Sequence, residues 1–113
     1  MRSLSMFALL LSFAFVAPAQ AQSVPGFCQK YAHKPQYLRT LSVLAKRMQY
    51  TETQLCTLPR LADIYITDTV LLNREQQPVP HIWITLHYSE NSCQYYFRAN
   101  DGFLTKSNCY NTW

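Results

Sequence analysis

The feature that most constrains this chain is a pair of cysteines placed symmetrically about a turn. Residues 100–102 (Asn-Asp-Gly) are typical of a three-residue hairpin loop, a type I turn closed by a glycine in the left-handed region. Counting outward from this loop places Cys93 directly opposite Cys109, within disulfide range for paired strands. A two-residue Asp-Gly turn would instead place Cys93 opposite Tyr110. The sequence therefore predicts a hairpin clamped by a Cys93–Cys109 disulfide.

The same counting extends to the preceding strand and predicts one buried sheet face. The three-residue loop pairs Phe97 with Thr105, and a four-residue loop over residues 89–92 places Ile84 opposite Phe97. One face then collects apolar and aromatic side chains, as burial requires, because a one-residue slip would turn that face to water. The main members of this predicted face are Ile82, Ile84, Leu86, Tyr95, Phe97 and Phe103.

Upstream of these strands the hydrophobic pattern has the period of a helix. Pro35 suits a first helical turn, and residues 36–50 repeat apolar side chains at helical spacing. The apolar stripe comprises Leu38, Leu41, Leu44, Ala45 and Met48, with Tyr37 at its margin, and the basic residues largely off the stripe are Lys34, Arg39, Lys46 and Arg47. We interpret this helix as core-facing with a solvated basic face. A helix that docks on a membrane surface or on a partner is the alternative.

The segments around this helix carry weaker signals. Thr51 and Gln54 have the spacing of a capping box, which predicts a second, short helix over residues 52–58 that Pro59 limits. Residues 23–33 are expected to form an extended arm held by Cys28. Residues 64–74 alternate as a strand with a bulge or strand end expected at Asp68, and residues 75–80 are expected to form a polar, mobile connection.

Four cysteines in a small chain of this kind indicate two disulfides. With Cys93 paired to Cys109, the second bridge joins Cys28 to Cys56. No Cys-x-x-Cys pair or His-x-x-x-His spacing occurs, so we expect neither a metal nor another cofactor. The predicted fold class is α+β, an N-terminal helix and a short second helix packed on a four-stranded antiparallel β-meander with two disulfides.

The N-terminal segment has the pattern of an export signal. Residues 1–21 combine Arg2, an apolar run over residues 7–16 and the small-x-small sequence Ala19-Gln20-Ala21. We therefore expect a cleaved signal peptide over 1–21 and a single small disulfide-bonded domain over 22–113, periplasmic or secreted. That domain has nine Lys and Arg against six Asp and Glu, a net charge of +3. The charge is too diffuse to predict nucleic-acid binding, and no membrane span is expected in the mature chain.

The predicted sheet face opposite the buried one is the candidate binding surface. The predicted register places Trp83 beside Arg98, Thr85 beside Tyr96 and His87 beside Gln94, with a cation–π contact between Arg98 and Trp83. Trp, Tyr and Arg dominate binding hot spots, so this face suits a protein partner. Ordinary cross-strand pairs on a solvated sheet are the alternative interpretation. The candidate binding residues are Trp83, Thr85, His87, Tyr96, Arg98 and Lys106.

Three functions follow from these features. The favoured one is an exported, non-enzymatic protein-binding domain, such as an inhibitor or an immunity-type protein. The first alternative is a small secreted hydrolase or nuclease that uses His87 with Glu90 and Arg98. No nucleophile motif or phosphate-binding glycine loop supports it, so no catalytic residue is assigned. The second alternative is an accessory subunit of an envelope or secretion assembly.

Overall fold

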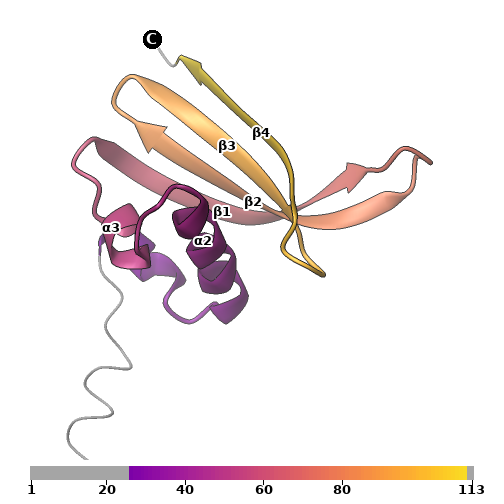
Figure 1. Cartoon of the computed structure of the whole chain (residues 1–113), viewed down its shortest axis with the longest axis horizontal. Coiled ribbons are helices and arrows are strands. Elements are labelled where there is room, and N and C mark those ends of the chain that lie inside the picture. The colour runs from indigo at the N-terminus through magenta and orange to yellow at the C-terminus, as the bar shows by residue number, and fades with distance from the viewer. Residues whose placement is uncertain (1–25, 112–113) are drawn as a thin grey trace, which may run out of the picture.

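The computed structural model describes residues 26–111, and it confirms the predicted α+β class. A four-stranded antiparallel sheet has the strand order β1-β2-β3-β4, and the helices pack on one of its faces (Figure 1). The elements are η1 (Gly26–Tyr31), α2 (Pro35–Arg47), α3 (Glu52–Cys56), β1 (Leu61–Leu72), β2 (Pro78–Tyr88), β3 (Asn91–Arg98) and β4 (Leu104–Asn111). The predicted signal peptide, residues 1–21, lies outside the described residues.

The two predicted helices form for the reasons read from the sequence. Pro35 occupies the first turn of α2, where its missing N–H leaves no intrahelical bond unmade. The capping box of α3 is confirmed, because the Gln54 N–H donates to Thr51 Oγ1 at 3.1 Å and the Thr51 N–H donates to Gln54 Oε1 at 2.8 Å. The buried face of α2 is made of Tyr37, Thr40, Leu41, Leu44 and Ala45.

The extended arm expected before α2 is wrong for the described part of that segment. Gly26–Tyr31 is a 3₁₀ helix, whose three-residue turn brings Cys28 and Tyr31 to the same, buried side. The Cys28–Cys56 disulfide is confirmed and ties this helix to the end of α3, with a Cα–Cα distance of 5.5 Å. Both half-cystines are fully buried.

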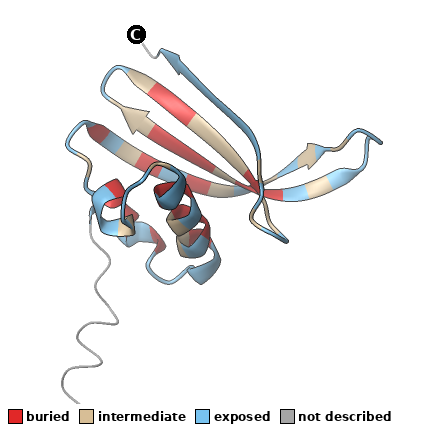
Figure 2. Ribbon diagram, in the orientation of Figure 1, coloured by how far each residue is buried: buried red, intermediate tan, exposed pale blue. Residues whose placement is uncertain are grey.

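The core lies between the helices and strands β1, β2 and β3, on which the buried residues gather in Figure 2. Even-numbered residues of β2 face the helices, as the two-residue period of a strand requires. The largest fully buried apolar side chains are Phe97, Leu41, Leu44, Leu55, Ile64, Ile82, Ile84 and Leu86. The predicted buried face is therefore correct for Ile82, Ile84, Leu86 and Phe97, whereas Tyr95 is half-buried and Phe103 is exposed.

The β3–β4 hairpin has the predicted disulfide and an unpredicted bulge. Cys93 pairs with Cys109 and their Cα atoms are 4.0 Å apart. Farther along, Tyr96 pairs with Lys106 but Phe97 pairs with Leu104, which leaves Thr105 as the extra residue of a β-bulge. The predicted pairing of Phe97 with Thr105 is therefore wrong. The predicted three-residue loop is wrong too, because the Arg98 N–H donates to the Phe103 carbonyl at 2.8 Å and residues 99–102 form a four-residue loop. The expected burial of Phe103 is also wrong, because its side chain is 59% exposed beyond this irregularity.

The predicted register between β2 and β3 is wrong by two residues. Leu86 pairs with Cys93 and Ile84 with Tyr95, because the connection is shorter than four residues and β3 already begins at Asn91. A shift of two residues keeps every side chain on its predicted face but changes its neighbours.

The long β1–β2 hairpin departs from expectation at both ends. The pairing irregularity lies between Leu61 and Asp63, whereas Asp68 pairs regularly with Ile82, so the bulge expected there is wrong. The connection spans residues 73–77, because β1 ends at Leu72 and β2 begins at Pro78, whereas residues 75–80 were expected. Asn73 organises this turn, because its Oδ1 accepts the backbone N–H groups of Glu75 and Gln77, both at 2.9 Å.

Side chains cover the outer edge of β1 beside the helices. The Ile66 N–H donates to the Tyr31 hydroxyl at 2.8 Å, and the Ile64 N–H donates to Asp63 Oδ1 at 2.8 Å. The Tyr31 ring is itself held edge-on against Tyr37, with ring centroids 5.7 Å apart. Two N–H groups of an edge strand, which could otherwise pair with another chain, are thus satisfied internally.

Candidate functional site

The six predicted binding residues lie on the sheet face that the helices leave uncovered. The register places Trp83, Tyr96 and Lys106 in one row across β2, β3 and β4, with Thr67 of β1 beside Trp83. Thr85 and His87 lie in later rows toward the β2–β3 turn, and Arg98 lies in an earlier row opposite His81. We call this surface the open face.

The centre of the open face is a stack of three side chains. The Trp83 and Tyr96 rings are nearly parallel, 13° apart with centroids separated by 5.6 Å. Lys106 Nζ lies 5.5 Å from the centre of the Tyr96 ring. The Trp83 indole nitrogen is buried and has no hydrogen-bond partner among the described residues. An unsatisfied buried donor costs about 1–3 kcal/mol, which offsets part of the stability gained by burying the indole ring.

Arg98 contacts a different aromatic residue from the one predicted. Its guanidinium lies 4.9 Å from the centre of the Phe103 ring, so the predicted stacking on Trp83 is wrong. Two parallel hydrogen bonds join it to Asp101, from Nε to Oδ1 at 3.0 Å and from Nη2 to Oδ2 at 2.6 Å. These bonds raise the pKa of Arg98 and lower the pKa of Asp101. Arg98 is thus fixed at the end of the open face.

Thr85 and His87 contribute less surface than predicted. Thr85 is 3% exposed, and it pairs with Gln94 where Tyr96 was expected. His87 pairs with Ser92 where Gln94 was expected, and its Nδ1 lies 2.8 Å from Ser92 Oγ. The register also aligns Asp63 with His87, but Ser92 is fully buried. A hydroxyl without solvent access cannot attack a substrate, so this row does not form a catalytic triad.

Sequence reasoning missed His81, which lies in the row of Arg98. Its side chain is buried, its Nδ1–H donates to the Val79 carbonyl at 2.8 Å, and its Nε2 lies 2.9 Å from Thr105 Oγ1. A hollow of about 380 Å³ opens above it, between the β1–β2 tip and Lys106. Strand alternation placed His81 on this face, but only the bulge in β4 brings the Thr105 hydroxyl to its ring.

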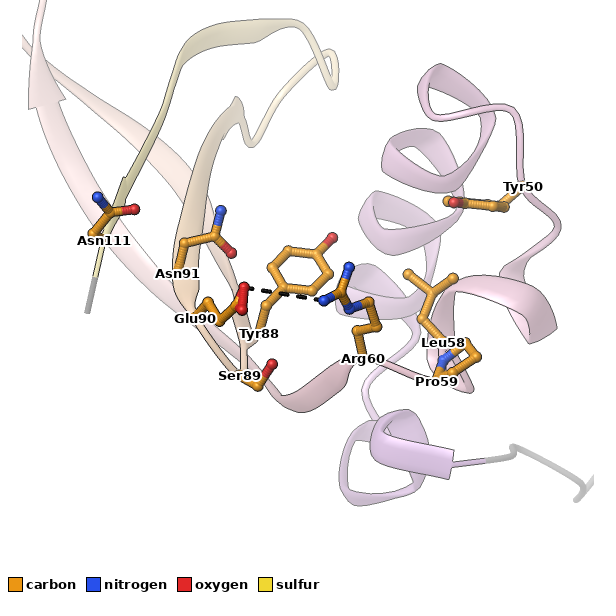
Figure 3. A pocket seen from close by; sticks show the side chains of 9 residues that line it. All are labelled: Tyr50, Leu58, Pro59, Arg60, Tyr88, Ser89, Glu90, Asn91 and Asn111. Carbon is orange, nitrogen blue, oxygen red and sulfur yellow. Dashed lines mark ion pairs between the residues drawn. The ribbon is translucent and has the colours of Figure 1, made fainter. Parts of the chain in front are cut away.

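A wider groove of about 740 Å³ lies at the helical side of the sheet and was not predicted. Figure 3 shows Tyr88 beside the Arg60–Glu90 ion pair, whose nitrogen and oxygen are 4.0 Å apart. Burial raises the pKa of Tyr88, and the neighbouring Tyr95 and Tyr50 raise it further. The lining residues are Tyr50, Leu58, Pro59, Arg60, Tyr88, Ser89, Glu90, Asn91 and Asn111. They come from four separate segments, and no local pattern in the sequence joins them.

The residues of the hydrolase alternative are not brought together. His87 pairs with Ser92 and His81 with Arg98, so six residues of β2, about 20 Å at ~3.3 Å per residue, separate His87 from Arg98. Glu90 instead faces Arg60 across the groove. Within residues 26–111, no three His, Cys, Asp or Glu side chains gather as a metal site. No helix in that range is long and apolar enough to span a membrane.

The fold and surfaces define a small disulfide-bonded α+β domain with one open sheet face. Comparisons of the chain with protein-family models, with curated proteins and with solved structures found no match.

Proposed function

We propose that this chain is an exported, non-enzymatic protein-binding domain, of the inhibitor or immunity type, which docks through its open face. The observation that carries the proposal is the Trp83–Tyr96–Lys106 stack on a sheet face that no helix covers. Aromatic side chains that are already ordered lose little conformational freedom on binding, and for that reason Trp and Tyr dominate hot spots.

The surroundings of the stack supply the polar part of such an interface. Lys106 places positive charge at the margin of the face, whereas the charge of Arg98 is neutralised by its ion pair with Asp101. We infer a partner whose docking surface is acidic around an apolar centre.

The disulfides support the exported location. Cys28–Cys56 and Cys93–Cys109 are of the kind that persists in an oxidising compartment, as expected of a periplasmic or secreted protein. Export through a cleaved signal over residues 1–21 is part of the proposal. An accessory subunit of an envelope assembly would use the same face and would differ in its partner.

The proposal is tested by capture on the purified, disulfide-bonded chain from an extract of its own envelope, with mass spectrometry as the readout. We expect the wild-type chain to retain a defined protein that a Trp83→Ala/Lys106→Ala variant does not. A hot-spot residue contributes about 2 kcal/mol, so each substitution is expected to weaken binding about 30-fold.

The matched control is Tyr50→Ala/Arg74→Ala, which removes one aromatic residue and one cation from outside the open face. It is expected to retain the captured protein. Lys106→Glu, at an exposed position, tests the face without disturbing the aromatic stack. Undiminished capture by both open-face variants would reject the docking surface, and the absence of any captured protein would reject the function.

A further inference from the structure

The exposed side of α2 forms a second surface, which the open face does not use. Arg39, Val43 and Lys46 recur at i, i+4 and i+7 and therefore lie in one line along the helix, with Arg47 beside Lys46. All four side chains are exposed, and Val43 is 39% exposed at the centre of the line. We call Arg39, Val43, Lys46 and Arg47 the basic face.

The cations of the basic face and Lys34 have no acidic partners. Within the described part of the chain, none of Lys34, Arg39, Lys46 and Arg47 has a carboxylate oxygen within 4.0 Å of a side-chain nitrogen. One carboxylate, that of Asp68, shares a shallow hollow with Lys34 and Arg39 without forming an ion pair with either. The Lys34 ammonium lies 5.2 Å from the centre of the Tyr37 ring.

Charge is divided unequally between the two layers of the fold. Residues 26–58 carry five Lys and Arg and a single acid, Glu52. Residues 59–111 carry four Lys and Arg and five Asp and Glu. The modest net charge of the chain therefore conceals a strongly basic helical layer, and an anionic surface would attract the domain with that layer foremost.

We propose that the basic face docks on an anionic lipid surface. Lys and Arg side chains near an anionic bilayer are attracted to its acidic phospholipids, each by about 1 kcal/mol, and the basic face has three of them. An exposed apolar side chain between the cations, here Val43, suits the boundary between headgroups and acyl chains, and the exposed Tyr50 follows the end of the helix. An acidic protein would satisfy the cations but gives Val43 no comparable apolar layer.

This docking leaves the open face free. Helix α2 lies on one side of the sheet (Figure 1). Its buried residues pack toward the sheet, so the exposed basic face lies on the opposite side of the helix, away from the open face. A lipid surface and a protein partner would thus contact opposite sides of one thin domain. The inference stands on the charge of the helical layer and does not depend on the proposed protein partner.

The test is sedimentation of the purified, disulfide-bonded chain with large unilamellar vesicles. One set is pure phosphatidylcholine and the other contains equal parts of phosphatidylcholine and phosphatidylglycerol. We expect binding to the phosphatidylglycerol vesicles alone and its loss at high salt, where screening shortens the reach of charge. Each cation near an anionic bilayer is worth about fivefold in partitioning, so Lys46→Gln/Arg47→Gln is expected to reduce binding about 25-fold.

The matched control, Arg60→Gln/Arg74→Gln, removes the same charge from the sheet layer and is expected to change binding less than about threefold. Val43→Glu is expected to abolish binding while leaving the melting temperature unchanged, because position 43 lies outside the core. Equal losses in the two charge variants, or no difference between the vesicle sets, would overturn the proposal. Binding to soluble polyglutamate but not to vesicles would also overturn it and would assign the basic face to an acidic protein.

Discussion

The hydrogen bond from the Ile66 N–H to the Tyr31 hydroxyl offers a direct test of how the helical layer protects the sheet. Tyr31→Phe removes one oxygen and leaves the ring, with its edge-on contact to Tyr37, in place. Tyr31 is 8% exposed and Ile66 is 3% exposed, so water has little access to the freed N–H. The substitution therefore isolates one buried hydrogen bond from the packing around it.

The expected cost follows from that burial. A buried donor left without its partner loses the full desolvation penalty, about 1–3 kcal/mol. We expect Tyr31→Phe to lower the free energy of unfolding by about 2 kcal/mol. For a domain of this size, that loss corresponds to a fall of roughly 10 °C in Tm.

The assay is urea unfolding with both disulfides intact, followed by near-ultraviolet circular dichroism. The unfolding midpoint should fall while the slope m stays the same, because the substitution exposes no additional surface. Hydrogen exchange at the Ile66 amide should quicken. The control is Tyr65→Phe. Tyr65 is 49% exposed, so removing its hydroxyl should lower the free energy of unfolding by less than about 0.5 kcal/mol. Equal costs for the two variants would refute the reasoning that Tyr31 caps the edge of β1.

Two further predictions concern backbone space and pH. Gly26 (φ +62°) and Gly102 (φ +75°) both adopt the left-handed backbone conformation, which costs a non-glycine residue about 1–2 kcal/mol. A Cβ at Gly26 would also collide with the Cys56 carbonyl, whereas a Cβ at Gly102 would meet nothing within 4 Å. Chemical denaturation should therefore find Gly26→Ala clearly more destabilising than Gly102→Ala, and equal effects would contradict the packing at Cys56. Desolvation favours a raised pKa at Asp63, but the hydrogen bond from Lys30 and the Ile64 N–H outweigh it, so the pKa of this carboxyl lies below its ordinary 3.8. A carboxyl whose pKa is lower in the folded state stabilises the fold at pH values above its unfolded-state pKa, and this stabilisation is lost as pH falls through the folded-state pKa. Asp63→Asn should therefore flatten the decline in unfolding free energy below about pH 4. An unchanged decline would exclude Asp63 as its source.

Local and periodic features account for most of what could be predicted. The expected turn at residues 100–102 and the spacing of the cysteines predicted the correct Cys93–Cys109 bridge, but only because the actual loop over residues 99–102 is one residue longer and the bulge at Thr105 compensates for it. The remaining two cysteines then paired by elimination. The capping box of α3 and the proline at the start of α2 are contacts within a few residues. Such features depend on chain geometry alone, so the sequence contains all that is needed to read them.

On the open face, likewise, the side of the sheet was predictable and the contacts between side chains were not. A strand alternates its side chains with period two, so the sequence assigned Trp83, Tyr96 and Lys106 to one face, and this assignment survived a register error of two residues. The predicted cross-strand neighbours were wrong, because a register shift of two residues leaves each side chain on its face but pairs it with a different residue. Arg98 accordingly contacts Phe103 instead of Trp83.

Only the tertiary structure decided where segments distant in sequence meet. The bulge at Thr105, the groove around Tyr88 and the Tyr31 hydroxyl on the edge of β1 each depend on how the helical layer and the four strands pack. Their energies are set by burial, which no local pattern measures. The sequence by itself determined the two α-helices, the four strands, the disulfides and the face of the strand residues before the bulge at Thr105. The packing decided the 3₁₀ helix, which rows align, which edge is covered and which charges stay unpaired.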